Sequence, residues 1–176
     1  MSDELIPDVR LQIVKWALYL VTNRRRCIYT ETPERSNFLD QPIGHLPFEG
    51  DCSSTDTACY FWAGAPDPND LDYAYAGDTD TLIAHGQHIA RDQAMVADII
   101  IFGLNPTRHA ALIVREPNSL CMSMGHQGDP SLISADNLAA GVHAFWGGDS
   151  NVMTFCRFDT RNRHLPPEPG PGPRPA

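Results

Sequence analysis

The sequence predicts an α+β fold, in which amphipathic helices come first and an antiparallel sheet follows. Two stretches in the first half carry apolar residues at three- and four-residue spacings, and from residue 98 onward short apolar runs alternate with tight turns. The 176 residues, 42% of them hydrophobic, suffice for one domain with a real core. We assign this domain to residues 1–165. Residues 166–176 are mostly Pro and Gly, so we expect an extended linker or tail there.

The first half is expected to hold three helices. Residues 8–23 form the first, because their apolar side chains recur every three or four positions. A β-prone run at residues 27–30 and a polar, Pro-rich loop over residues 31–50 precede the second helix, which Asp51 caps. Residues 79–90 are the third predicted helix.

The second half is expected to form the sheet. A continuous apolar run is typical of a buried strand, and strict alternation is typical of a half-buried one. Tight turns between three of these runs favour an antiparallel meander. The predicted strands are residues 98–103, 109–114, 120–124 and 151–158, with a short helix at 136–144.

Composition excludes several classes of protein. A net charge of −9 argues against a nucleic-acid partner, which would require a basic face. No apolar run is long enough to span a membrane, so we expect no membrane partner. The acidic start lacks the basic and apolar regions of a signal peptide, so we expect synthesis in the cytoplasm. The five cysteines are an odd number without a CxxC pair, which argues against a disulfide scaffold or a structural zinc site.

A cysteine at the start of the second predicted helix is the first candidate for chemistry. Cys52 follows the cap residue Asp51, so its thiol lies in the first helical turn. Free N–H groups and the helix dipole favour the thiolate there, and the thiolate is the reactive form. The alternative interpretation is a half-buried cysteine that happens to follow a cap.

A histidine at the start of a predicted strand supplies a base for this thiol. A thiol nucleophile needs a base within hydrogen-bond reach, and the base needs an orienting group on its other nitrogen. His109 begins the second strand, and strand parity puts it on one face with Ala111, whose small side chain leaves room for the helix to approach. On the next strand, His126 is the candidate orienting group and Gln127 the second. His126 is alternatively an ordinary loop histidine.

Several motifs, taken in order, resemble those of NlpC-type cell-wall cysteine peptidases. Residues 51–54 read Asp-Cys-Ser-Ser, residues 97–103 Ala-Asp-Ile-Ile-Ile-Phe-Gly, and residues 109–114 His-Ala-Ala-Leu-Ile-Val. The Trp-Ala-Gly-Ala-Pro-Asp-Pro-Asn turn at 62–69 and the Thr-Leu-Ile-Ala-His-Gly segment at 81–86 look like the peptidase modules of actinobacteriophage endolysins. The resemblance covers roughly residues 8–160.

The resemblance implies a papain-like α+β fold, with helices packed on an antiparallel sheet and the nucleophile at a helix N-terminus. It implies hydrolysis of peptidoglycan stem peptides, typically between D-glutamate and diaminopimelate, with Cys52 as nucleophile, His109 as base and no cofactor. A phage lysin would be made in the host cytoplasm and act at the cell wall, and a further cell-wall-binding or lytic domain would follow the linker. Besides Asp51 and Ser53, which flank the thiol, we count Tyr29 and His85 as candidate substrate-binding residues. Tyr29 matches a family tyrosine or is simply a strand aromatic.

One departure from the family's pattern concerns the third catalytic residue. The family's Ser-His-Gly appears here as Ser-Met-Gly, so Met124 stands where the orienting histidine is expected. A thioether is a poor acceptor for an imidazole N–H. Either His126 or Gln127 takes this role, or the third group is absent.

The residues leave four alternative functions open. A broken triad would suit a cell-wall-binding module that does not cut, and the same Cys–His pair could serve an N-acetylmuramoyl-L-alanine amidase or a transglutaminase-like acyl transfer. A zinc hydrolase could use His85 and His88 as ligands, but Gly86 breaks the helix that would align them. No metal is therefore expected.

Overall fold

The computed structural model describes residues 8–104, 106–117, 119–125 and 130–161. Within these residues, six antiparallel strands form the central sheet in the order β3-β8-β4-β5-β6-β7. Their bounds are β3 (Gln87–Ile89), β4 (Ile99–Phe102), β5 (His109–Arg115), β6 (Leu120–Met124), β7 (Pro130–Ser134) and β8 (Met153–Arg157). The sheet is larger than the predicted meander, because β3 and β7 add to it.

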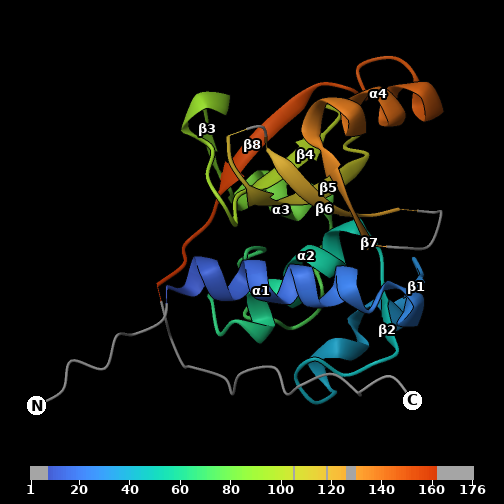
Figure 1. The fold of residues 1–176 in the computed structure, drawn as a ribbon, viewed down its shortest axis with the longest axis vertical. Helices are drawn as coiled ribbons and strands as arrows, with labels where there is room; N and C mark the ends of the chain where they lie inside the picture. Colours follow the sequence, from blue (N-terminus) through green and yellow to red (C-terminus); the bar gives the residue numbers. More distant parts are fainter. Residues whose placement is uncertain (1–7, 105, 118, 126–129, 162–176) are drawn as a thin grey trace, which may run out of the picture.

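Helices cover the two faces of this sheet, so the molecule has three layers (Figure 1). The helices are α1 (Val9–Thr22), α2 (Cys52–Trp62), α3 (Thr79–His85) and α4 (Ala135–Trp146). Helices α1 and α2 pack against each other and against β5 and β6 from one side, while α4 contacts β4 and β7 from the other. The predicted α+β, papain-like class, with helices on an antiparallel sheet, is thus confirmed.

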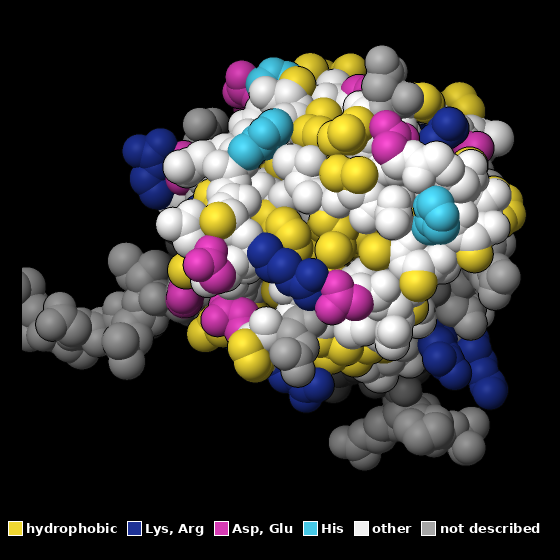
Figure 2. Space-filling view, turned by 90° about the horizontal axis from the view of Figure 1, so that it is seen from above, with side chains coloured by type: hydrophobic (Ala, Val, Ile, Leu, Met, Phe, Trp, Pro, Cys, Tyr) yellow, Lys and Arg dark blue, Asp and Glu magenta, His cyan; other side chains and the backbone are white. Residues whose placement is uncertain are grey.

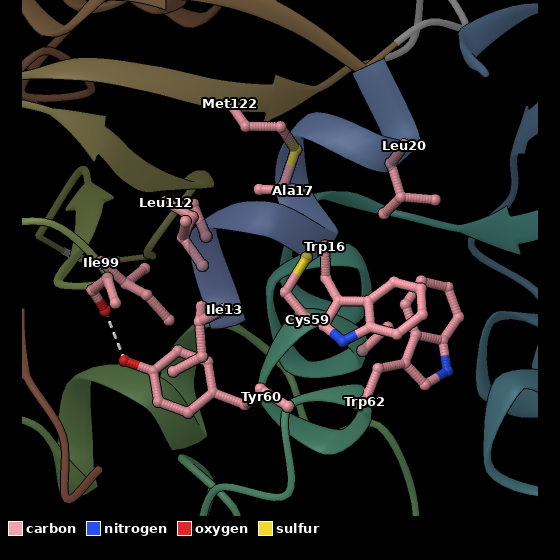
Figure 3. Packing of buried hydrophobic residues seen from close by; sticks show 14 of the residues in the cluster. Ile13, Trp16, Ala17, Leu20, Cys59, Tyr60, Trp62, Ile99, Leu112 and Met122 are labelled. Carbon is pink, nitrogen blue, oxygen red and sulfur yellow. Dashed lines mark hydrogen bonds between the residues drawn. The ribbon is translucent and has the colours of Figure 1, made fainter. Parts of the chain in front are cut away.

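The main core lies between the paired helices and the sheet. Side chains of α1, α2 and the central strands point toward one another there (Figure 3). The rings of Trp16 and Trp62 have their centroids 5.3 Å apart, and the buried Tyr60 hydroxyl donates to the Ala97 carbonyl. Burying each such large side chain contributes roughly 1.5–3 kcal/mol, so this interface holds α2 firmly against the sheet.

A second, smaller core lies on the α4 side of the sheet. Its buried members include Phe102 and Ile113, but Leu138, Trp146 and Met153 at its margin stay partly exposed. Figure 2, seen from above the view of Figure 1, shows hydrophobic side chains gathered in the middle of the face, with charged side chains and histidines near them. The sheet is therefore covered less completely on this side than beneath α1 and α2.

Helix α1 begins and ends where the sequence predicts. The Asp8 carboxylate accepts a hydrogen bond from the Arg10 N–H at 2.9 Å, and Asn23 closes the helix. Its predicted apolar stripe is buried, including Ile13 and Leu20. Local signals sufficed here because the cap and the stripe lie within the helix itself.

The predicted helix over residues 79–90 is wrong in its second half. Helix α3 ends at His85, and β3 follows after Gly86. A side chain at Gly86 would place its Cβ 2.6 Å from the Cβ of Cys156, so the backbone here lies directly against β8. Pairing with β8 outweighs the local tendency to continue the helix.

The predicted loop over residues 31–50 contains structure as well. A 3-10 helix (Pro33–Leu39) and strand β2 (Phe48–Gly50) lie in it, and two further 3-10 turns span Arg24–Arg26 and Arg91–Gln93. Strand β2 pairs in parallel with β1 (Cys27–Tyr29), forming a second, two-stranded sheet. Strand β2 ends at Gly50, two residues before α2 begins, so this small sheet positions the start of α2.

Two further predictions concern the C-terminal linker and the membrane. The proposed linker at residues 166–176 lies outside the described residues and stays a prediction. Among the residues described, no helix combines the length and the apolar character that crossing a bilayer requires.

Candidate active site

The start of α2 is held by a complete capping box. The Asp51 carboxylate accepts from the Ser54 N–H at 2.8 Å, and the Ser54 hydroxyl accepts from the Asp51 N–H at 2.8 Å. Two N–H groups that would lack partners at a helix start are satisfied in this way. Cys52 is therefore fixed as the first residue of the helix.

Arg35 fastens the preceding loop to this helix start. Its guanidinium forms an ion pair with the Asp51 carboxylate (Nε–Oδ2 2.6 Å) and donates to the Ser53 hydroxyl at 3.0 Å and to the Gly77 carbonyl. The Ser53 hydroxyl in turn donates to Asp51 at 3.0 Å. Asp51 and Ser53, predicted to bind substrate, thus both take part in holding the helix start in place.

The Cys52 thiol lies against strand β5. The side chain is 8% exposed, and the backbone N–H groups of Ala110 and Ser53 donate to its sulfur. Ala110 belongs to the core that includes α2, whereas Ala111 belongs to the core on the α4 side. The residue that lets the helix approach is therefore Ala110. The expectation for Ala111 is wrong because parity places it on the opposite face.

Burial opposes the thiolate that the helix start favours. Desolvation, followed by the charge of Asp51, raises the pKa of Cys52 to about 12, although the two N–H donors act in the other direction. The expected resting thiolate is thus not supported, since desolvation outweighs the helix terminus. A nucleophilic reaction at Cys52 would therefore require a base that takes the thiol proton.

His109 stands at the first position of β5, next to Ala110. The residue is 6% exposed, and its Nε2 lies 2.8 Å from the Ser123 hydroxyl oxygen on β6. The ring of Phe102 lies 6.0 Å away, centroid to centroid. The thiol contacts the backbone of the residue that follows His109, so both predicted catalytic residues lie at the same end of β5.

A cavity of about 330 Å³ opens beside this histidine. Tyr29 and Glu31 line it on one side, and Arg108 contributes a positive charge. The opposite wall comes from α4 and is apolar and aromatic. Its residues are Leu138, Gly141, Val142, Phe145 and Trp146. Phe145 is 70% exposed, so this wall continues onto the surface.

Tyr29 belongs to the site. It lines the cavity, and its hydroxyl donates to the Glu31 carboxylate at 2.7 Å. Burial, the Glu31 bond and the nearby Cys52 all raise the pKa of the Tyr29 phenol, so it stays protonated as a donor. Its prediction as a substrate-binding residue is compatible with this position.

The predicted orienting residues His126 and Gln127 lie outside the described residues. Met124, at the family's histidine position, is buried in the core beneath α1 and α2. The register pairs Ile113 with Cys121, so the residues on the same face as His109 are Cys121 and Ser123. Met124 therefore points away from His109.

His85 is not brought together with the catalytic candidates. It lines a different cavity, of about 600 Å³, with Pro66, Asp67 and Arg157 among its neighbours. Its Nδ1 lies 2.9 Å from the Thr81 carbonyl, and the Nε2 of His88 lies 3.0 Å from the Ile83 carbonyl. Among the described residues, no three His, Cys, Asp or Glu side chains gather so as to hold a metal ion.

Sequence reasoning missed Ser123 and Arg35. Both are polar residues of ordinary type in expected strand or loop positions. Ser123 lies on the same face of the sheet as Cys121, whereas Met124 lies on the opposite face. The alternation along the strand could have identified Ser123 only once the pairing of β6 with β5 was known. Arg35 had no local signal, since its partners lie 16 and more residues away.

The chain is similar to solved structures, and one of these neighbours is a named domain. The crystal structure of the NlpC/p60 domain of the peptidoglycan hydrolase SagA superimposes with a TM-score of 0.51 at 16% sequence identity, covering 84% of this chain and 98% of that one. The chain has the NlpC/p60 fold. At this identity the likeness concerns the fold, and no protein-family model or curated protein matches the sequence.

Proposed function

We propose that the chain is a peptidoglycan hydrolase that cleaves amide bonds of stem peptides by thiol chemistry. The observation that carries the proposal is the meeting of the Cys52 thiol with the start of β5, at the residue next to His109. The fold shared with the NlpC/p60 domain of SagA supports the same conclusion. The cavity beside His109 offers space for a short peptide.

The chemistry proceeds in two halves. His109 accepts the thiol proton while the Cys52 sulfur attacks the carbonyl carbon of the scissile amide. The C–N bond then breaks, and the leaving amine takes that proton from His109, which leaves a thioester on Cys52. A water molecule, deprotonated by His109, hydrolyses the thioester and restores the thiol. The backbone N–H of Cys52, at the start of α2, is suited to stabilise the oxyanion.

The charges around the cavity suit a peptide that carries both signs. Arg108 can pair with a free carboxylate of the stem, and Glu31 can receive an amino group. The α4 wall can cover the methyl groups of alanine residues. These features favour the stem peptide as the substrate class, with the bond between D-glutamate and diaminopimelate as the proposed point of cleavage.

The role in phage lysis is a further part of this proposal. Its support is the order of the endolysin-like motifs, from the turn at 62–69 to the segment at 81–86. The site of action would then be the host cell wall, with peptidoglycan as the partner.

The proposal is tested by incubating purified diaminopimelate-type peptidoglycan with the wild type and with Cys52→Ala. We expect new amino groups only with the wild type, because the variant lacks the attacking sulfur. Cys59→Ala is the matched control, since it removes a thiol from the same helix away from His109. Circular dichroism checks that both variants fold.

The identity of the new amino group decides between the candidate bonds. Release of the diaminopimelate amine supports the endopeptidase, while a new L-alanine terminus assigns the amidase. Equal release by wild type and Cys52→Ala would refute thiol catalysis. Binding of both proteins to peptidoglycan without any release would identify a binding module.

A further inference from the structure

We propose that Ser123 is the positioning residue of His109 and fills the place that the family pattern gives to a histidine. The inference rests on the proposed function and deepens it. It starts from the contact between His109 Nε2 and the Ser123 hydroxyl at 2.8 Å. The two ring nitrogens then have separate roles, because Ser123 holds Nε2 while Nδ1 serves as the base for Cys52.

The contact is buried on both sides. His109 and Ser123 are each only 6% exposed. A hydrogen bond removed from water is stronger than one on the surface, and breaking it leaves a buried polar group unsatisfied. The bond therefore restricts rotation of the ring.

A serine hydroxyl can accept or donate a hydrogen bond, and in this proposal Ser123 is the acceptor toward Nε2. When the Ser123 oxygen accepts from Nε2–H, the proton of the neutral imidazole sits on Nε2, and Nδ1 is the unprotonated, basic nitrogen. In this tautomer Nδ1 is the ring nitrogen that can take the Cys52 proton. After the transfer both nitrogens carry protons, and the Ser123 oxygen remains an acceptor for the imidazolium.

The strand geometry explains why the role falls on Ser123. Neighbouring residues of β6 point to opposite faces, and Met124 is buried in the core beneath α1 and α2. A histidine at position 124 would therefore point away from His109. The serine lies on the correct face and one step nearer the strand interior, and its short side chain still reaches the ring.

The other described side chains near the His109 ring are placed to make other contacts. The titratable or charged side chains that share its cavity are Tyr29, Glu31 and Arg108, and the Tyr29 hydroxyl is directed at Glu31. The α4 wall is uncharged, and the Phe102 ring packs at 6.0 Å. The Cys52 thiol lies at the backbone of Ala110, the residue that follows His109 on β5. The serine hydroxyl is thus the group placed to hold Nε2.

The first experiment measures the tautomer of His109 in the intact protein by long-range proton–nitrogen NMR. The His109→Gln spectrum identifies the signal among the seven histidines. We expect the Nε2–H tautomer in the wild type and a mixture in Ser123→Ala. An Nδ1–H tautomer in the wild type would overturn the proposal without any serine variant.

The second experiment compares Ser123→Ala with Ser123→Thr, which keeps the hydroxyl on a strand-compatible side chain. We expect kcat on peptidoglycan fragments to fall about tenfold in Ser123→Ala with KM nearly unchanged, and to recover in Ser123→Thr. The acid limb of the kcat profile should move about 0.5 pH unit lower in Ser123→Ala, because the imidazolium loses an acceptor.

The outcomes separate this inference from the proposed function. Unchanged kcat, pH profile and tautomer in Ser123→Ala, with Cys52→Ala inactive, would refute the role of Ser123 alone. Equal losses in Ser123→Ala and Ser123→Thr would show a packing role and also refute it. Activity that survives in Cys52→Ala would refute the proposed function, while the NMR result would still report on the His109–Ser123 bond.

Discussion

At the scale of single residues, the Cys52 thiol lies between opposing influences. The N–H groups of Ser53 and Ala110 favour its thiolate, whereas burial and the neighbouring Asp51 carboxylate disfavour it. Arg35 partly offsets that carboxylate through their ion pair. The net effect is a raised pKa of the Cys52 thiol, so under the proposed function Cys52 reacts only after a base has taken its proton.

The effect of the Asp51 charge can be measured directly. In Asp51→Asn the amide oxygen can still cap α2, but the negative charge is gone and Arg35 becomes an uncompensated cation nearby. Both changes lower the pKa of Cys52, so its alkylation by iodoacetamide at pH 8 should become about three- to tenfold faster. Mass spectrometry identifies the labelled cysteine and gives the rate.

Asp78→Asn is the matched control for this experiment. Asp78 caps α3 in the same way, through a capping box with Thr81, but it does not contribute to the pKa of Cys52. Its variant should alkylate at the wild-type rate. An unchanged rate in Asp51→Asn would show that the Asp51 charge does not control the thiol.

At the scale of elements, a buried carboxylate joins α1 to the sheet. Asp98 is fully buried just before β4, and it forms ion pairs with Arg10 of α1 at 3.0 Å and with Arg157 of β8 at 2.8 Å. It also accepts from the Met95 N–H at 2.9 Å. The Asp98 carboxylate thus links α1 to β4 and β8, and it helps to hold α1 against α2 and the sheet.

Loss of this charge should therefore destabilise the whole fold. We expect Asp98→Asn to lower the free energy of unfolding by about 3 kcal/mol, because two arginines lose their partner in a partly buried place. Asp136→Asn, which breaks the exposed pair with Arg91, should cost less than about 1 kcal/mol. Urea unfolding of both variants measures the difference. Equal losses would contradict the role of burial.

At the scale of the whole molecule, buried thiols link stability to pH. Burial raises the pKa of Cys52 and of Cys121 to about 12 and raises that of Cys59 well above its usual value. The folded state therefore holds these protons more tightly than the unfolded chain does. Their contribution is fully present below pH 9, the ordinary thiol value, and is lost as pH rises toward 12.

Unfolding experiments in urea between about pH 7 and pH 10.5 test this linkage. The free energy of unfolding should be level near neutrality and fall above pH 9, by up to about 1.4 kcal/mol per pH unit for each buried thiol. Cys121→Ala removes one such thiol, so its curve should start lower at neutral pH and fall less steeply. If the free energies of unfolding of the wild type and Cys121→Ala fell equally steeply with pH, the raised pKa of the buried Cys121 thiol would be contradicted.

The sequence by itself determined what depends on neighbours along the chain. The cap at Asp8, the stripe of α1, the cap at Asp51 and the placement of Cys52 and His109 at element starts all rest on such local signals. They sufficed for the fold class and for two candidate catalytic residues.

Only the tertiary structure decided which residues meet. The register of β6 against β5 brings Ser123 to His109 and turns Met124 away, and pairing with β8 ends α3 at His85. Burial also decided that Cys52 rests as a thiol. Strand register and desolvation arise from contacts between segments far apart in the sequence, so no local pattern specifies them.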